Sequence, residues 1–282
     1  MPENNNKNYI VNEDLGELRY LSAMHMKNTV AQFMVGIIML YMFTNLVPDV
    51  LGFFMPKSYF SVIPTEIDPK LLKKFVADYP FASFVYAIAF GGMFTLGRSL
   101  YMLRYLRNKE CDYPSILDGA RHIFSATLLF IVQLAIIAAF ATLFVVPGVY
   151  AFYTYRQSFL IMAEDPSKGV FKCLAESRRL MAGNRMRQFQ LDFTYIPLII
   201  IANVPAILFG YVGMPDLGMY TNLIVILIRF ILQIPVFYAM GNLFFGQTVF
   251  YELMVSKGFS NFIYKGEDVF RAGVRARLQD RE

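Results

Sequence analysis

The chain has 282 residues, of which 56% are hydrophobic and only 17% are charged, whereas soluble domains carry about 25% charged residues. This composition excludes an ordinary soluble domain, so the formal net charge of +5 is not interpreted as a nucleic-acid-binding footprint. The two cysteines, Cys111 and Cys173, form neither a disulfide framework nor a CxxC metal pattern.

Long uncharged runs define the class of the protein. They cover residues 28–48, 79–97, 122–155, 193–215 and 230–251. A membrane-spanning helix needs about 20 mainly apolar residues. We therefore predict an all-α polytopic membrane helix bundle of about six transmembrane helices, arranged as three hairpins with interfacial helices on the cytoplasmic side.

The first 27 residues are polar and then amphipathic, because Leu15, Leu18, Leu21 and Met24 recur at a spacing of three. This pattern predicts a cytoplasmic N-terminal tail and interfacial helix over residues 1–27. No basic segment leads into a short apolar one, so we expect the first span itself to act as the insertion signal.

A transmembrane domain is predicted over residues 28–251, and a cytoplasmic C-terminal tail over residues 252–282. The predicted spans are about 28–48, 79–103, 122–146, 149–163, 190–210 and 219–250. The loop 49–78 is predicted to be external, and the second span to return to the cytoplasm at Arg98, Arg104 and Arg107. Gly91, Gly92 and Gly97 give that span small surfaces for close helix contact.

The uncharged run 122–155 is too long for one crossing, since 34 residues of helix measure about 51 Å against about 30 Å of hydrocarbon. Pro147-Gly148 is predicted to divide it. If residues 149–163 return to the cytoplasm, the cytoplasmic segments hold 20 Lys and Arg and the external loops hold 4. The positive-inside bias favours this arrangement. The short segment 149–163 is predicted either to span or to be re-entrant.

Residues 164–187 are predicted to form an interfacial helix with Asp165 as N-cap, Pro166 as first residue and Gly183-Asn184 as its stop. Its basic face is expected to contact anionic lipid headgroups. Its predicted apolar face consists of Val170, Phe171, Leu174, Ser177 and Met181.

Two arginines, Arg156 and Arg229, fall within apolar surroundings. A charge near the bilayer centre costs about 2.5–3.5 kcal/mol on insertion scales, so such residues pair or line wet cavities. We predict that they bind substrate together with Tyr153, Tyr155 and Asp192. The alternative is that Arg156 is satisfied by backbone carbonyls near Pro147 or snorkels to the interface.

Catalytic motifs are absent from the sequence. The only histidines, His25 and His122, have no second ligand at helical spacing, and no HExxH, GxSxG, Walker A or GxGxxG pattern occurs. We therefore expect a non-enzymatic protein with no metal and no cofactor.

The pattern from residue 147 to residue 192 resembles a bacterial integral-membrane family catalogued as domain of unknown function 975. Its matching residues here are Pro147, Gly148, Tyr155, Glu164, Asp165, Pro166, Ser177, Met181, Gly183, Asn184, Phe189, Leu191 and Asp192. The late run Phe250-Tyr251-Glu252-Leu253 adds to the likeness. The resemblance implies a multi-pass protein of the bacterial cytoplasmic membrane and no established activity. A looser version of the pattern in the membrane domain of some glycerophosphodiester phosphodiesterases hints at a lipid setting.

Two functional hypotheses follow from the sequence. In the first, the protein binds or moves a small anionic or lipidic substrate in the cell envelope. In the second, it is a membrane scaffold or regulatory subunit that docks a partner through residues 164–187. The expected partners are the lipid bilayer and either a second copy or another membrane protein, and no nucleic acid.

Overall fold

The computed structural model describes residues 9–54, 81–109, 111–211 and 219–258, which are helical or form turns and contain no strand. Most of the predicted external loop 49–78 and of the C-terminal tail 252–282 lies outside these residues. In chain order, the helices are α1 (Leu15–Met26), α2 (Val30–Tyr41), the π-helical turn η1 (Met42–Leu46), α3 (Val47–Phe54), α5 (Phe81–Asn108), α6 (Ser115–Asp118), the 3-10 turn η2 (Gly119–His122), α7 (Ile123–Leu143), α8 (Val145–Tyr155), α9 (Ser158–Glu164), α10 (Val170–Leu180), α11 (Arg185–Tyr211), α12 (Met219–Leu232) and α13 (Ile234–Ser256).

Within the described residues, three helical stretches are long and apolar enough to cross a membrane: Val30–Leu51, Ser115–Leu143 and Arg185–Phe209. A fourth is obtained if Leu223–Leu232 and Ile234–Ser256, which meet at a bend of 47°, count as one broken span. The last apolar stretch is therefore kinked. The kink lies at Gln233, two residues before Pro235, which occupies the first turn of α13.

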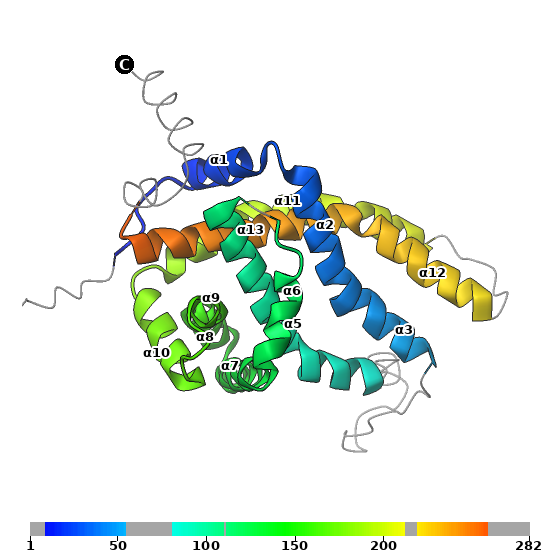
Figure 1. The fold of residues 1–282 in the computed structure, drawn as a ribbon, viewed down its shortest axis with the longest axis horizontal. Coiled ribbons are helices and arrows are strands. Elements are labelled where there is room, and N and C mark those ends of the chain that lie inside the picture. The colour runs from blue at the N-terminus through cyan, green and yellow to red at the C-terminus, as the bar shows by residue number, and fades with distance from the viewer. Residues whose placement is uncertain (1–8, 55–80, 110, 212–218, 259–282) are drawn as a thin grey trace, which may run out of the picture.

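Helix α5 runs through the middle of the molecule, with α2 and α3 on one side and α6, α7 and α9 on the other (Figure 1). Helices α11, α12 and α13 run mainly in the plane of the view, whereas α7, α8 and α9 are seen nearly end-on (Figure 1). The α7–α8 hairpin therefore crosses the direction of α13 steeply.

Aromatic side chains from α2, α5 and α13 form the centre of the core. The ring centroids of Phe33 and Tyr105 are 4.9 Å apart, and those of Tyr105 and Phe245 are 5.3 Å apart. All three side chains are fully buried. This packing fixes α5 against α13, the two helices that carry Arg98, Arg107 and Glu252.

The predicted close helix contact at the α5 glycines is confirmed for two of them. A Cβ atom on Gly97 would lie 1.9 Å from the carbonyl oxygen of Ile116, and one on Gly92 would lie 2.4 Å from that of Ala126. Any side chain at these positions would force apart α5 and the segment from α6 to α7. The glycines therefore allow the backbones to touch.

The break in the long apolar run lies at Phe144, not at Pro147-Gly148 as predicted. Phe144 has extended backbone angles and separates α7 from α8. Pro147 instead occupies the first turn of α8, where a missing N–H removes no intrahelical bond. Gly148 allows close packing of the two arms, because a Cβ there would lie 2.8 Å from the Cβ of Ala141.

The single helix predicted over residues 164–187 is instead a short helix between two turns. Glu164 ends α9, α10 begins at Val170 with Gly169 as N-cap, and Gly183 ends the segment with a φ of +88°. Asp165 caps the preceding turn, where its carboxylate accepts hydrogen bonds from the hydroxyl and the N–H of Ser167, which lower its pKa. Phe171 is 73% exposed and so is not part of the buried face of α10.

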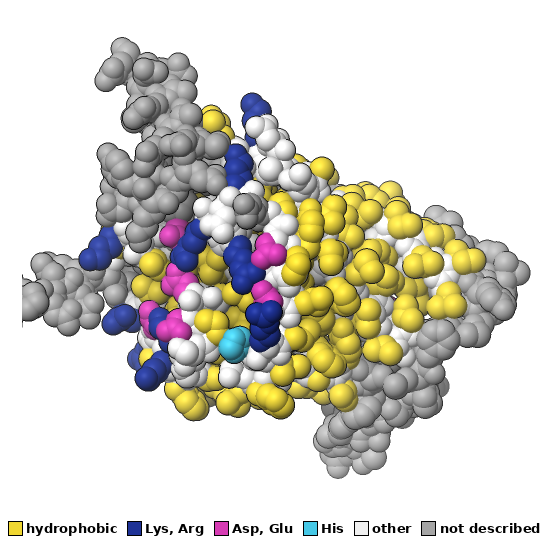
Figure 2. Space-filling view, in the orientation of Figure 1, with side chains coloured by type: hydrophobic (Ala, Val, Ile, Leu, Met, Phe, Trp, Pro, Cys, Tyr) yellow, Lys and Arg dark blue, Asp and Glu magenta, His cyan; other side chains and the backbone are white. Residues whose placement is uncertain are grey.

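Charged and apolar side chains separate on the surface. Lys, Arg, Asp and Glu gather over α10, α6 and the C-terminal half of α5 (Figure 2). An apolar surface covers α12 and the N-terminal half of α5 (Figure 2). We call the first region the charged end of the molecule.

Candidate functional site: a cavity between two arginines

A break between α8 and α9 positions the residues that carry the candidate site. Helix α8 ends at Tyr155 and α9 begins at Ser158, so Arg156 and Gln157 occupy the turn between them. Both side chains line a cavity of about 360 Å³. Its walls come from α5, α7, α8, α9 and α13.

Arg156 is held by an acidic residue from another helix. Its Nη2 atom lies 3.3 Å from Oδ2 of Asp192 on α11, and the two side chains are 18% and 12% exposed. The Asp192 carboxylate also accepts hydrogen bonds from the Tyr153 hydroxyl, at 3.2 Å, and from Nε2 of Gln247, at 2.9 Å. The guanidinium lies over the Phe152 ring, 4.5 Å from its centroid. The carboxylate thus has three donors, and the arginine has one acidic partner.

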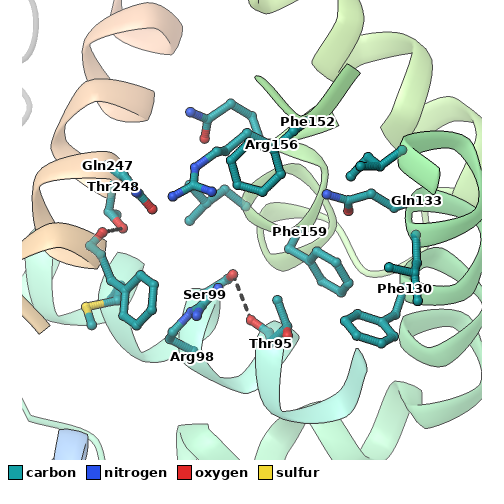
Figure 3. A pocket seen from close by; sticks show the side chains of 16 residues that line it. Thr95, Arg98, Ser99, Phe130, Gln133, Phe152, Arg156, Phe159, Gln247 and Thr248 are labelled. Carbon is teal, nitrogen blue, oxygen red and sulfur yellow. Dashed lines mark hydrogen bonds between the residues drawn. The ribbon is translucent and has the colours of Figure 1, made fainter. Parts of the chain in front are cut away.

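A second arginine faces the same cavity from the opposite wall. Figure 3 shows Arg98, on α5, across the cavity from Arg156. The Arg98 guanidinium lies 3.8 Å from the centroid of the Phe244 ring, a cation–π contact. No described carboxylate lies within ion-pair distance of Arg98. Arg156 therefore has a described acidic partner and Arg98 has none, and the two arginines are the charged residues that line the cavity, so its walls carry a net positive charge.

Buried amides beside Arg156 add polar groups with spare hydrogen-bonding capacity. Nε2 of Gln157 donates to Oε1 of Gln188 at 2.5 Å, and both side chains are fully buried. Oε1 of Gln157, Nε2 of Gln188 and Nε of Arg156 are buried without a hydrogen-bond partner among the described residues. Unsatisfied buried polar groups are uncommon in native proteins and often mark sites of bound water or ligand.

Of the predicted site residues, the structure brings together Arg156, Asp192 and Tyr153. Tyr155 packs against the core and does not line the cavity. Arg229 is exposed on α12, and its charge interacts electrostatically with that of Asp49 on α3. Arg229 is not among the residues that line the cavity, and it lies before the bend that precedes α13.

Arg98 and Gln247 are not among the site residues predicted from the sequence. An arginine at the end of an apolar run is typical of a membrane boundary, and Arg98 fits that pattern. A lone glutamine in an apolar helix carries little sequence signal. Both become candidate site residues only because they line the same cavity as Arg156, which lies far from them in the chain.

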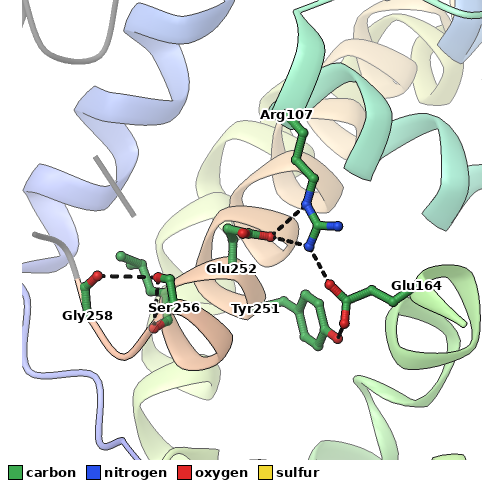
Figure 4. Close-up of polar contacts among 7 residues, drawn as sticks. Arg107, Glu164, Tyr251, Glu252, Ser256 and Gly258 are labelled. Carbon is green, nitrogen blue, oxygen red and sulfur yellow. Dashed lines mark hydrogen bonds and ion pairs between the residues drawn. The ribbon is translucent and has the colours of Figure 1, made fainter. Parts of the chain in front are cut away.

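A second group of charged residues ties three of the same helices together at the charged end. Arg107 on α5 forms ion pairs with Glu164 on α9 and, at 2.7 Å, with Glu252 on α13. The Tyr251 hydroxyl donates to the other oxygen of Glu164 at 2.7 Å. We call these four residues the Arg107 cluster (Figure 4). One arginine here serves two carboxylates, and Glu252 is 6% exposed.

Residues near the end of the 147–192 pattern hold the N-terminal segment in place. The Asn184 side chain accepts a hydrogen bond from the Val11 N–H at 2.9 Å and donates to the Tyr9 carbonyl at 2.8 Å. Arg187 donates to the carbonyls of residues 11–13. Ser177 donates to the Thr154 carbonyl at 2.9 Å and joins α10 to α8. Ser177 and Asn184, which belong to the pattern described above for residues 147–192, therefore hold the backbone in place, away from the cavity.

Groups of three or more His, Cys, Asp or Glu able to hold a metal ion do not occur among the described residues. A family model with the description "Protein of unknown function (DUF975)" matches residues 115–255. The chain belongs to this family. Searches of curated proteins and of solved structures found no match.

The DUF975 region runs from α6 to near the end of α13. It contains Arg156, Asp192 and Gln247, together with Glu164 and Glu252 of the Arg107 cluster. Arg98 and Arg107 lie on α5, before the matched region. One wall of the cavity thus comes from outside the part that defines the DUF975 family.

Proposed function

We propose that this DUF975 protein is a non-catalytic membrane protein that binds, and moves, a small anionic or lipidic substrate in the cavity between Arg98 and Arg156. The observation that carries the proposal is the excess of cationic over anionic side chains in a cavity formed between apolar helices. A volume of about 360 Å³ lies within the range of small-molecule sites, about 300–1,000 Å³.

An anionic ligand complements these walls for a physical reason. Arginines surrounded by apolar helices are costly unless they are paired, and Arg98 has an aromatic ring where a carboxylate would satisfy it. A guanidinium presents a fork of donors that matches carboxylate and phosphate oxygens. An anion held between the arginines would balance the charge that Asp192 leaves unmatched.

The proposed setting is the cytoplasmic membrane of a bacterium, crossed about six times with both termini in the cytoplasm. The separation of charged and apolar surfaces supports membrane insertion (Figure 2). The return arm over residues 145–164, broken once at Arg156-Gln157, measures about 30 Å if helical throughout. That length supports the version in which the arm spans rather than re-enters. Basic residues at the charged end would then face anionic lipid headgroups.

Ligand binding to the purified protein in detergent tests the proposal. Inorganic phosphate and butyl phosphate serve as anionic probes, with butanol and butylammonium as neutral and cationic controls. We expect anion-selective binding that weakens about 10–100-fold in Arg98→Met and in Arg156→Leu, since a hydrogen bond to a charged group contributes about 1.5–3 kcal/mol.

Arg229→Met is the matched control, because it removes an exposed arginine that lies away from the cavity. It should bind the probes as the unaltered protein does. Equal binding by all three variants, or binding without selectivity for anions, would overturn the proposal.

One observation favours a second candidate, a scaffold that docks a partner through α10. Phe171 is 73% exposed on a helix that also presents Lys172, Arg178 and Arg179. An exposed aromatic among basic residues suits a protein partner or a second copy of the chain. A stoichiometric partner that co-purifies, and is lost in Arg178→Glu/Arg179→Glu, would support this candidate.

A further inference from the structure

A second cavity, of about 260 Å³, adjoins the first at Arg98. The two cavities share Thr95, Arg98, Phe130 and Phe244 as lining residues. The second continues from this junction between α5 and the segment formed by α2 and η1. Arg98 therefore stands where the two spaces meet.

The second cavity offers mainly hydrocarbon, with the Tyr41 hydroxyl and Arg98 among its polar groups. Thr44 donates to the Leu40 carbonyl at 3.0 Å, Tyr86 to the Phe43 carbonyl at 2.8 Å, and Thr95 to the Gly91 carbonyl at 2.7 Å. The hydroxyl hydrogens of these three lining residues are thus already used by the backbone. The rest of the wall is mainly aliphatic and aromatic, with Arg98 as its charged member.

A mouth on the apolar surface is marked by Ala87, an exposed residue of α5 that lines the second cavity. Its neighbour Phe84 is 51% exposed, and Phe90 is 37% exposed. On the other wall, Thr44 belongs to the π-helical turn η1, an irregularity frequently found at functional sites. An apolar chain could therefore enter from the hydrocarbon side.

We propose that the ligand is a single-chain anionic amphiphile. Its phosphate or carboxylate head lies between Arg98 and Arg156, and its hydrocarbon chain fills the second cavity. This inference rests on the proposed function and narrows its substrate class. The arrangement suits such a molecule, since Arg156 and Arg98 face the first cavity and the second cavity extends from Arg98 along mainly apolar side chains.

A chain-length series of alkyl phosphates tests the inference, with inorganic phosphate as the arm that has no chain. Binding is measured on the protein in nanodiscs of fixed composition. Each buried methylene contributes about 0.8 kcal/mol, so we expect about fourfold tighter binding per added methylene until the second cavity is full, and a plateau beyond it.

Ala87→Phe should abolish the gain with chain length and leave binding of inorganic phosphate unchanged. The exposed position of Ala87 lets the larger side chain be accommodated without disturbing the core. Val85→Phe is the matched control, because Val85 is 46% exposed on the same helix and lines neither cavity. It should keep the full chain-length dependence.

The outcomes separate this inference from the proposed function. If phosphate binding needs Arg98 and Arg156 but chain length has no effect, the amphiphile is rejected and the anion site stands. An equal chain-length gain in the unaltered protein and in Ala87→Phe also rejects it, because the chain then partitions elsewhere. If phosphate binding is indifferent to both arginines, both proposals fail.

Discussion

The Arg107 cluster and the cavity both combine arginines with carboxylates, but carboxylates are in excess in the cluster and arginines are in excess at the cavity. Both take side chains from α5 and α13, and Arg107 follows Arg98 by nine residues on α5, a rise of about 13 Å. In the Arg107 cluster one arginine meets two carboxylates and a tyrosine supports one of them. At the cavity Arg156 pairs with Asp192, whereas Arg98 lies against the ring of Phe244 and has no described carboxylate within ion-pair distance.

The difference separates a structural role from a binding role. Every charged side chain of the Arg107 cluster has a partner on another helix, so the cluster joins α5, α9 and α13 and has little left to offer a ligand. Among the described residues, Arg98 has an aromatic ring but no carboxylate as its partner, and polar atoms of Gln157 and Arg156 have no hydrogen-bond partner. A bound anion would supply the negative charge and the hydrogen-bond acceptors that the walls of the cavity lack.

The largest effect is expected from removing the arginine of the cluster. Arg107→Leu leaves Glu252, only 6% exposed, without its cation, and loss of one partner of a buried pair costs about 3–5 kcal/mol. Because Arg107 itself is 42% exposed, we expect the lower end, about 3 kcal/mol, in the free energy of unfolding measured in detergent. Arg104→Leu is the control: its pairs with Asp112 and Asp118 are more exposed, so about 1 kcal/mol or less is expected. Equal losses in the two variants would contradict a special role for the cluster.

A smaller effect is expected from the carboxylate of the cavity. Asp192→Leu leaves Arg156 and the Tyr153 hydroxyl without their acceptor, which should cost about 1–3 kcal/mol of unfolding free energy. The double variant Asp192→Leu/Arg156→Leu should recover part of this loss, with a coupling energy of about 0.5–3 kcal/mol. Strict additivity would show that the pair contributes nothing as a pair.

By contrast, Arg98→Met should change the free energy of unfolding by about 1 kcal/mol or less.

The smallest effect is expected from acidification from pH 7 to 6, through a buried histidine on α1. His25 on α1 is 2% exposed, and its Nε2 atom lies 3.2 Å from the Tyr105 carbonyl oxygen. Burial lowers the pKa of His25 from 6.5 to about 4, so the unfolded chain binds its proton first on acidification. Stability should be full above pH 6.5 and fall by up to about 1.4 kcal/mol per pH unit between pH 6.5 and 4.

Thermal unfolding in detergent at pH 7, 6 and 5 measures this effect. His25→Gln should show a flatter dependence over that range, because no imidazole remains to be protonated. Parallel curves for the two proteins would show that His25 does not carry the acid sensitivity. Ligand binding by the cavity should be unaffected by His25→Gln, because the ring contacts Tyr105 and Phe245 and lines neither cavity.

Much of the fold could be predicted because apolar run length is a local property of the chain. The runs at residues 28–48, 122–146 and 190–210 coincide with long apolar helices. The positions at which helices end are predicted less well. Pro147 is conspicuous in the sequence, yet a proline in the first turn of a helix is compatible with that helix, and the chain turns at Phe144, which carries no such signal.

The candidate site was predicted only in part, because its members come from helices that are far apart in the chain. Arg156 stands out in sequence as a charge within an apolar run, and Asp192 as an acid beside another. Their pairing depends on the packing of α8 against α11, which the helical spacing of each segment does not encode. Arg229 carries the same sequence signal as Arg156 but lies on the far side of the bend before α13.

The sequence by itself determined the all-α class, the apolar segments and the presence of a charge at Arg156, because hydrophobicity and length act residue by residue. Only the tertiary structure decided which charges meet. Ion pairs and cavities depend on the positions of side chains separated by tens of residues, and those positions follow from the bends at Phe144 and Gln233 and from the aromatic packing of α5 on α13. The excess of arginine around the cavity, on which the proposed function rests, exists only at that level.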